Sequence, residues 1–231
     1  MQLLRSDPRF KHQLQLVSIH IPKTAGTSFR NTLREVYGED HVVRLDITLE
    51  EEKIRLNEKD WNGPRLSKDI QVAHGHFSPS LFQKYFRENE ANYITWLRHP
   101  VERVISNYYY LVKRLKEELE EERKGLNILS KLQRSLEEYA SAPLNQNRIS
   151  KFLSGRALED FAFVGIQEHY QADLQRLAQL LEWPTAPHFR HNVTGKRYEV
   201  STDLRKQIAS YNEADMILYE KGLELREKYQ A

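Results

Sequence analysis

Apolar positions along this chain alternate between short runs typical of buried strands and stripes at helical spacing. Leu14–Ile21 predicts a first strand, followed by a helix over Thr27–Tyr37. Further strands are expected at Val42–Asp46, Ile70–Ala73, Tyr93–Leu97 and Phe161–Ile166. The other expected helices are Leu49–Lys59, Pro79–Glu88, one beginning at Pro100, Tyr170–Leu181, Asp203–Ala209 and Ala214–Tyr229. Strands separated by helices indicate an α/β fold with a central parallel sheet flanked by helices.

Length and composition narrow the class of protein. The 231 residues are most simply one domain, over residues 1–231. A net charge of +2 gives no general basic field, so we do not expect a nucleic-acid partner. The absence of cysteine excludes disulfides and thiolate metal sites. No apolar run is long enough to span a membrane, so we expect a cytoplasmic, bacterial protein without leader or anchor; a trimmed catalytic domain is the alternative.

The segment 111–140 is heavily charged and has helical character. The favoured interpretation is a solvated helix supported by ion pairs between residues four apart. The alternative is a helical insertion that acts as a movable flap over an acceptor site, with Gly125 as the break between two helices.

Chemically distinctive residues follow three of the expected strands, at 22–28, 74–76 and 98–106. Ligands of parallel sheets bind at the edge formed by the carboxyl ends of the strands. We therefore expect these three segments to lie at one edge of the sheet.

The segment after the first strand has the composition of an anion site. It contains one lysine, Lys23, followed by Thr24, Ala25, Gly26, Thr27 and Ser28 at the start of a helix. Helix amides and a lysine together hold phosphate-like groups. The nucleotide-triphosphate loop G-x-x-x-x-G-K-[ST] is not present, because Lys23 precedes the turn and Gly26 is its only glycine. The alternative is an ordinary strand-to-helix corner with a solvated lysine.

Arg98 and Ser106 could bind a second anion. Arg98 ends an expected strand, and Ser106 lies on the following helix. A guanidinium and a hydroxyl that converge in this way can clamp a phosphate. A surface ion pair for Arg98 and a neutral helix position for Ser106 are the alternatives.

Together, these two segments resemble the donor-binding motifs of sulfotransferases. Pro22-Lys23-Thr24-Ala25-Gly26-Thr27-Ser28 is similar to the loop that binds a 5′-phosphosulfate, and Arg98-x-Pro100-x-x-Arg103-x-x-Ser106 is similar to the 3′-phosphate motif. The resemblance is strongest to Golgi carbohydrate sulfotransferases, the heparan sulfate and uronyl 2-O-sulfotransferases above all. It implies a P-loop-like fold and 3′-phosphoadenosine 5′-phosphosulfate (PAPS) as donor. It also implies adenosine 3′,5′-bisphosphate (PAP) as product, a carbohydrate hydroxyl as acceptor and no metal.

The resemblance implies roles for two further segments. Lys196 and Arg197 match a basic loop that closes over the nucleotide. Asn145, Gln146 and Arg148 match a motif on the acceptor side, although a capped turn before the next helix is an equal alternative. Within the expected reaction, Lys23 is the candidate cation for the leaving phosphate oxygen.

His74-Gly75-His76 supplies the candidate base. Histidine titrates near neutral pH, and both side chains would project to the same side of an extended segment. The resemblance favours His76 as base, with His74 orienting it or binding the acceptor. A structural histidine at a strand end is the alternative for each. A zinc site formed by His74 and His76 is not expected, because no third ligand is evident. His20 is expected to pack at the sheet edge. His99 is expected to be a variable position inside the 3′-phosphate motif.

Two other classes of function stay open at this stage. One is a kinase with an unusual phosphate loop, and the other is a non-catalytic binder of nucleotides or glycans. The acceptor is a saccharide or a small metabolite, and Tyr108, Tyr109 and Tyr110 could stack on a sugar. The oligomeric state is not predicted.

Overall fold

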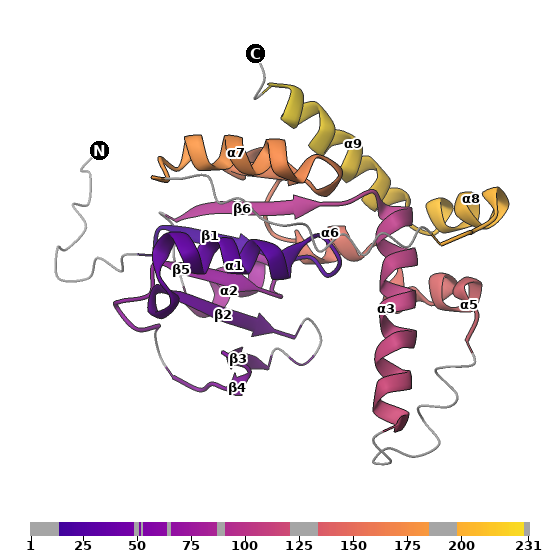
Figure 1. The fold of residues 1–231 in the computed structure, drawn as a ribbon, viewed down its shortest axis with the longest axis horizontal. Helices are drawn as coiled ribbons and strands as arrows, with labels where there is room; N and C mark the ends of the chain where they lie inside the picture. The colour runs from indigo at the N-terminus through magenta and orange to yellow at the C-terminus, as the bar shows by residue number, and fades with distance from the viewer. Residues whose placement is uncertain are drawn as a thin grey trace.

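A seven-stranded sheet forms the centre of the molecule (Figure 1). The structure is a computed structural model that describes residues 14–48, 51, 53–63, 66–86, 91–120, 134–184 and 198–228. In the order of the sheet, the strands are β4 (Lys59–Asp60), β3 (Ile54–Leu56), β2 (Val42–Ile47), β5 (Val72–Gly75), β1 (Leu16–Ile19), β6 (Asn92–Leu97) and β7 (Phe163–Ile166).

The five strands from β2 to β7 pair in parallel, which confirms the expected α/β class. β1 lies between β5 and β6, and Ile19 is in register with both Gly75 and Thr95. The carboxyl ends of these three strands are therefore adjacent. This places the segments at 22–28, 74–76 and 98–106 at one edge of the sheet, as the sequence predicted.

The prediction of a helix at Leu49–Lys59 is wrong. Within the described part of this segment, β3 pairs antiparallel with β2, and β4 continues the sheet. Ile54 and Leu56 lie opposite Ile47 and Leu45, so their apolar side chains extend the core face of β2. The free energy gained by strand pairing and burial of these side chains outweighs the weak preference of this polar segment for a helix.

Helices cover both faces of the sheet (Figure 1). One core cluster joins α1 and α7 to one face, and a second joins α2, α6 and α9 to the other. The helices are α1 (Gly26–Tyr37), α2 (Pro79–Phe86), α3 (Pro100–Glu120), α5 (Leu136–Ser141), α6 (Arg148–Phe152), α7 (Tyr170–Leu180), α8 (Thr202–Ser210) and α9 (Glu213–Lys228). Short 3₁₀ turns lie at Glu39–His41, Pro143–Asn145, Leu158–Asp160 and Gln167–His169.

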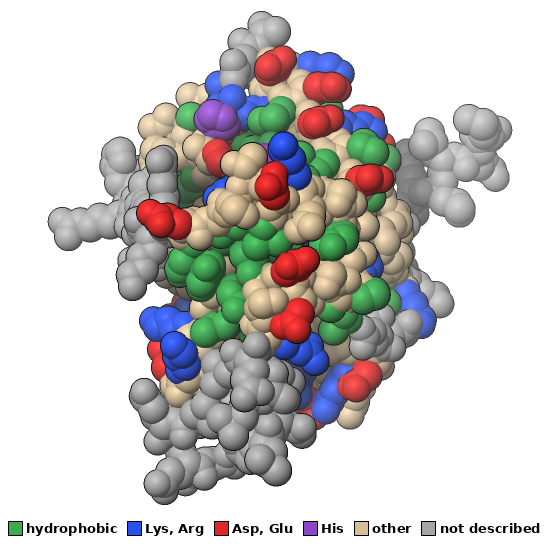
Figure 2. All heavy atoms as spheres, turned by 90° about the vertical axis from the view of Figure 1, so that its right-hand side faces the viewer, with side chains coloured by type: hydrophobic (Ala, Val, Ile, Leu, Met, Phe, Trp, Pro, Cys, Tyr) green, Lys and Arg blue, Asp and Glu red, His purple; other side chains and the backbone are tan. Residues whose placement is uncertain are grey.

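The long helix α3 stands across the side of the molecule toward which the strand arrows point (Figure 1). A third core cluster joins it to α5 and α8. Figure 2 views the molecule from this side and shows hydrophobic side chains gathered at the centre of the face. Residues 111–120 and 136–141 are helical as expected, whereas 121–133, including Gly125, lie outside the described residues. The flap therefore stays a prediction.

Gly75 allows β2 and β5 to approach closely. β5 ends at Gly75 rather than at Ala73, so the glycine is part of the strand. A Cβ atom at this position would lie 1.8 Å from the backbone oxygen of Leu45. Glycine at position 75 therefore leaves room for the neighbouring strand β2.

We expect Gly75→Ala to lower the free energy of unfolding by about 3 kcal/mol, because neither backbone can move without breaking the strand pairing. Urea denaturation measures the change. Gly222→Ala on α9 is the matched control, since its Cβ would meet the ends of the Leu97, Ile166 and Val164 side chains, at 2.6, 3.4 and 3.7 Å, and no backbone atom among these nearest neighbours. Equal midpoints for the two variants would contradict this role of Gly75.

Candidate active site

The turn between β1 and α1 presents free helix amides. Lys23 and Ala25 have positive φ values of 73° and 67°, which turn the chain sharply into α1. Ala25 is the N-cap and forms no side-chain capping hydrogen bond. The first amides of α1 therefore have no acceptor from the cap, and such amides bind anions together with the helix dipole.

The hydroxyls of this turn differ in their surroundings. Thr24 is buried, and its hydroxyl donates to the carbonyl of Ile21 at 2.8 Å. Thr27 is exposed and Ser28 is half-buried. The Thr24 hydroxyl thus holds the turn in shape, and a contact between Thr24 and a ligand stays a prediction.

Lys23 and Arg98 bring two cations to this edge. A guanidinium nitrogen of Arg98 donates to the Lys23 carbonyl at 3.3 Å, which ties the segment after β6 to the turn after β1. The Lys23 Nζ lies 4.0 Å from the ring centre of Tyr110 on α3. Burial and the nearby Arg98 lower the pKa of Lys23. Within the described residues Lys23 has no ion-pair partner.

Glu168 is a further residue of this edge, to which the sequence assigned no role. It follows β7, and its carboxylate accepts from the His99 amide at 3.0 Å and the Tyr219 hydroxyl at 3.3 Å. Burial lowers the pKa of Arg98, and the charge of Glu168 opposes that shift. Glu168 thus fixes the start of the segment that carries Arg98.

Ser106 and Arg103 lie on α3 and differ in their exposure to solvent. Ser106 is half-buried, whereas Arg103 is only 2% exposed. Burial lowers the pKa of Arg103, and the buried carboxylate of Asp215 on α9 opposes that shift. Glu102 instead pairs with Arg205. Arg103 is therefore a core residue facing an acid of the C-terminal helix.

Three histidine rings meet where β1 and β5 end; we call His20, His74 and His76 the histidine cluster. The His20 ring stacks on His76 with 4.3 Å between ring centres, and on His74 with 5.2 Å. His74 is 2% exposed, and its Nδ1 lies 2.9 Å from the Ser18 hydroxyl. His20 was expected to pack at the sheet edge; it does so against both members of the His-Gly-His motif.

The hydrogen bonds of His76 fix its tautomer. Its Nδ1 lies 2.8 Å from the His20 carbonyl. A carbonyl only accepts, so Nδ1 carries the proton in the neutral ring and Nε2 keeps its lone pair. Burial lowers the pKa of His76, while Asp46 opposes that shift. The neutral ring near pH 7 can therefore accept a proton at Nε2.

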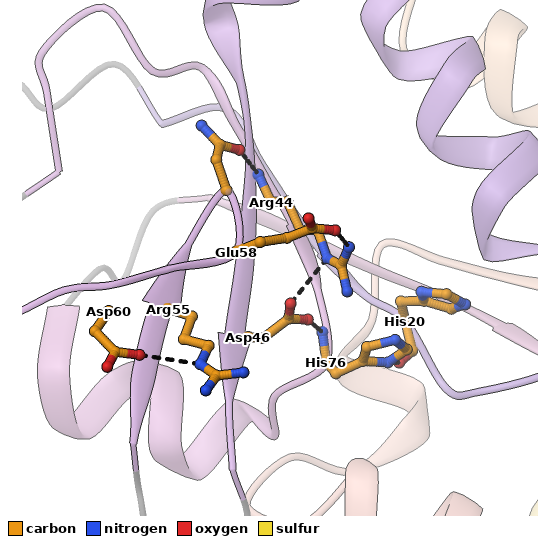
Figure 3. A network of polar contacts seen from close by, with 8 residues as sticks. His20, Arg44, Asp46, Arg55, Glu58, Asp60 and His76 are labelled. Atoms are coloured by element: carbon orange, nitrogen blue, oxygen red, sulfur yellow. Dashed lines mark hydrogen bonds and ion pairs between the residues drawn. The ribbon is translucent and has the colours of Figure 1, made fainter. Parts of the chain in front are cut away.

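Asp46 at the end of β2 holds the backbone of His76. Its carboxylate accepts from the His76 amide at 3.1 Å and lies 2.8 Å from the Nε of Arg44 (Figure 3). Arg44 also pairs with Glu58. Asp46 ends the strand predicted at Val42–Asp46, but no role for its carboxylate was predicted from the sequence. Its position at a carboxyl end beside β5 is the signal that could have found it.

The segment at 145–148 forms a turn before α6. Asn145 and Gln146 donate to the carbonyls of Tyr139 and Ser141 at 2.8 and 2.7 Å. The Arg148 guanidinium lies over Phe152, 5.1 Å from the ring centre, and its charge contributes to lowering the pKa of His76. Asn145 and Gln146 thus stabilise the turn, whereas Arg148 faces the histidine cluster. Lys196 and Arg197 lie outside the described residues.

The chain is similar in sequence to a known protein family. The model of the sulfotransferase family matches residues 7–221, which is most of the chain. The protein belongs to the sulfotransferase family. Over 119 residues it is 29% identical to heparan sulfate 2-O-sulfotransferase 1 of Homo sapiens and of Mus musculus. The same enzyme of Gallus gallus is 30% identical over 101 residues.

The similarity to these relatives is partial. The matched stretch covers 46% of this sulfotransferase and 32% of the human and mouse enzymes, so the chain spans about a third of their length. A crystal structure of a sulfotransferase from Alicyclobacillus acidocaldarius covers 87% of this chain and 92% of its own, with 15% identity and a TM-score of 0.43. Among the described residues, no helix has the length and apolarity to cross a membrane, and no group of three acids or histidines is arranged to hold a metal.

The histidine cluster makes the stability of this sulfotransferase depend on pH. Burial lowers the pKa of His20 and His76, and lowers the pKa of His74 to about 3. The unfolded chain therefore binds protons first as the pH falls below about 6.5. We expect the free energy of unfolding to decrease from pH 6.5 toward pH 3, by up to about 1.4 kcal/mol per pH unit for each histidine.

Urea denaturation between pH 7.5 and pH 5 measures this slope. His74→Asn, which can still hydrogen-bond Ser18, should reduce it. His169→Gln replaces an exposed histidine and should leave it unchanged. An identical slope in the wild type and His74→Asn would contradict the contribution of His74.

Proposed function

We propose that this sulfotransferase moves a sulfuryl group from PAPS to a carbohydrate hydroxyl, with His76 as general base. The observation that carries the proposal is that one sheet edge holds the helix amides of α1, two cations and a histidine of fixed tautomer. PAPS has anionic groups at both ends of its nucleotide. Lys23 would bind the 5′-phosphosulfate end, and Arg98 with Ser106 the 3′-phosphate.

The proposed step is an in-line transfer. The acceptor oxygen forms a bond to sulfur while the bond from sulfur to the 5′-phosphate oxygen breaks. His76 Nε2 takes the acceptor proton, and PAP leaves with the electron pair of the broken bond. Negative charge grows on the phosphate oxygen, so Lys23 stabilises the transition state more than the ground state.

The remaining residues have supporting roles in this proposal. The amides of Gly26, Thr27 and Ser28, with the Thr27 and Ser28 hydroxyls, hold the phosphosulfate oxygens. Lys196 and Arg197 close over the nucleotide. The similarity to heparan sulfate 2-O-sulfotransferases supports a saccharide acceptor, and the charge of Arg148 suits one that is anionic.

Transfer from radiolabelled PAPS to a panel of acidic and neutral polysaccharides tests the function. We expect label in at least one polysaccharide, together with an equal amount of released PAP. A parallel reaction with labelled ATP and Mg²⁺ tests the kinase alternative. Label transferred from ATP, with none from PAPS, would overturn the proposal.

A further inference from the structure

The backbone of His20 is tied to the segment that carries the proposed base. Its amide donates to the Gly75 carbonyl at 2.7 Å, and its carbonyl accepts from His76 Nδ1 at 2.8 Å. The bond to Nδ1 sets the tautomer of His76. It does not by itself set the direction of the His76 ring. A ring that pivots about a single hydrogen bond needs packing to hold its Nε2 in place.

The side chain of His20 supplies that packing on one side. Its ring stacks on the His76 ring at 4.3 Å with 27° between the ring planes, and on the His74 ring at 5.2 Å with 16°. Figure 3 shows the His20 and His76 rings side by side. His74 is itself held by Ser18 of β1, so the stack rests on a fixed ring.

The edge of the His20 ring that carries Nε2 lies close to Gly26, on the donor side of the site. A Cβ atom added to Gly26 would lie 1.8 Å from His20 Nε2 and 2.1 and 2.2 Å from its carbon neighbours. Gly26 is the first residue of α1, where the proposed donor phosphosulfate binds. The ring of His20 therefore fills the space between the donor turn and the proposed base.

We propose that His20 is a positioning residue that holds the His76 ring at a fixed place relative to the donor turn. The proposal rests on the proposed function, because the position matters for transfer between donor and acceptor. In-line transfer needs the base, the acceptor oxygen and the sulfur to be aligned, and small displacements lower the rate strongly.

The charges around His20 favour this role over that of a base. Burial, then His76, His74, Arg44 and Lys23, all lower the pKa of His20. For His76, Asp46 opposes the effects of burial, Arg44 and Arg148. Among the described residues, a carboxylate stabilises the protonated form of His76 and none does so for His20. His20 thus stays neutral while His76 accepts the proton.

The test uses His20→Ala, which removes the ring and keeps the carbonyl. We expect kcat to fall about 10- to 100-fold, with PAP affinity changed less than about threefold. The ¹⁵N spectrum of the imidazole rings is the second readout. It should show the Nδ1–H tautomer of His76 in both proteins, because the carbonyl of residue 20 is kept. In the variant the His76 signals should shift and broaden, because the ring is no longer packed. His169→Gln is the control for replacement of an exposed histidine.

A double-mutant cycle with Gly26→Ala tests the contact with the donor turn. In the presence of His20 the added methyl should displace the ring and shift the His76 signals. In His20→Ala the same methyl enters vacated space and should leave them unchanged. PAP titrations of all four proteins show whether the methyl also obstructs the donor.

Two results would overturn the positioning role. One is an Nε2–H tautomer of His76 in the wild type, which needs no variant to fold. The other is His20→Ala with wild-type kcat and wild-type His76 signals. Failure of the proposed function would appear differently, as absence of transfer and of PAP binding in the wild type while the His20–His76 coupling in the spectra persists.

Discussion

Replacing His76 with alanine is expected to lower the rate of sulfuryl transfer by about 10²- to 10⁴-fold, the usual contribution of a general base. Binding of PAP should not change, because the ring lies beside β5 and not at the donor turn. The structure gives the physical reason: the His20 carbonyl holds the proton on Nδ1, so Nε2 is free to accept one.

The pH dependence of kcat/KM in the wild type also tests the role of His76 as base. Burial lowers the pKa of His76, so the ring is neutral at pH 7 and kcat/KM should decline only below about pH 6.5. His169→Gln is the control for loss of an exposed imidazole. His76→Ala that binds PAP normally and transfers at the wild-type rate would remove His76 as base.

Replacing Lys23 with methionine is expected to lower kcat by about 10²- to 10³-fold, the effect of removing one group that stabilises a developing anion. Methionine keeps an apolar chain against Tyr110 and removes the charge. Because the charge on the leaving oxygen grows in the transition state, kcat should fall more than the affinity for PAPS.

Single-turnover kinetics with saturating PAPS separate these two effects. Lys53→Met is the matched control, since Lys53 is an exposed lysine that pairs with Asp60 at the far edge of the sheet. A Lys23→Met enzyme with normal kcat and weakened donor binding would show that Lys23 contributes only to ground-state binding.

The arrangement of the site could be predicted because it depends on strand order and local motifs. Apolar runs located β1, β5 and β6, and parallel pairing brought their carboxyl ends together. The turn at Lys23 and the His-Gly-His segment are each contiguous in sequence. Such features follow from local composition and from the general rules of α/β sheets.

Other features depend on contacts between distant residues, which composition does not reveal. The segment that contains β3 is polar overall, and β3 forms because Ile54 and Leu56 extend the core face of β2. Asp46 reaches His76 across 30 positions of the chain, and the His20 ring meets Gly26 through a turn.

Calorimetric titration of the wild-type protein with PAP, AMP and ATP tests the central claim most directly, because it needs no knowledge of the acceptor. The account predicts that one PAP binds per chain and does so at least about tenfold more tightly than AMP, since the 3′-phosphate gains charge-assisted hydrogen bonds. Arg98→Ala should remove that preference. Binding of AMP or ATP as tight as that of PAP would contradict the assignment of this edge to PAPS.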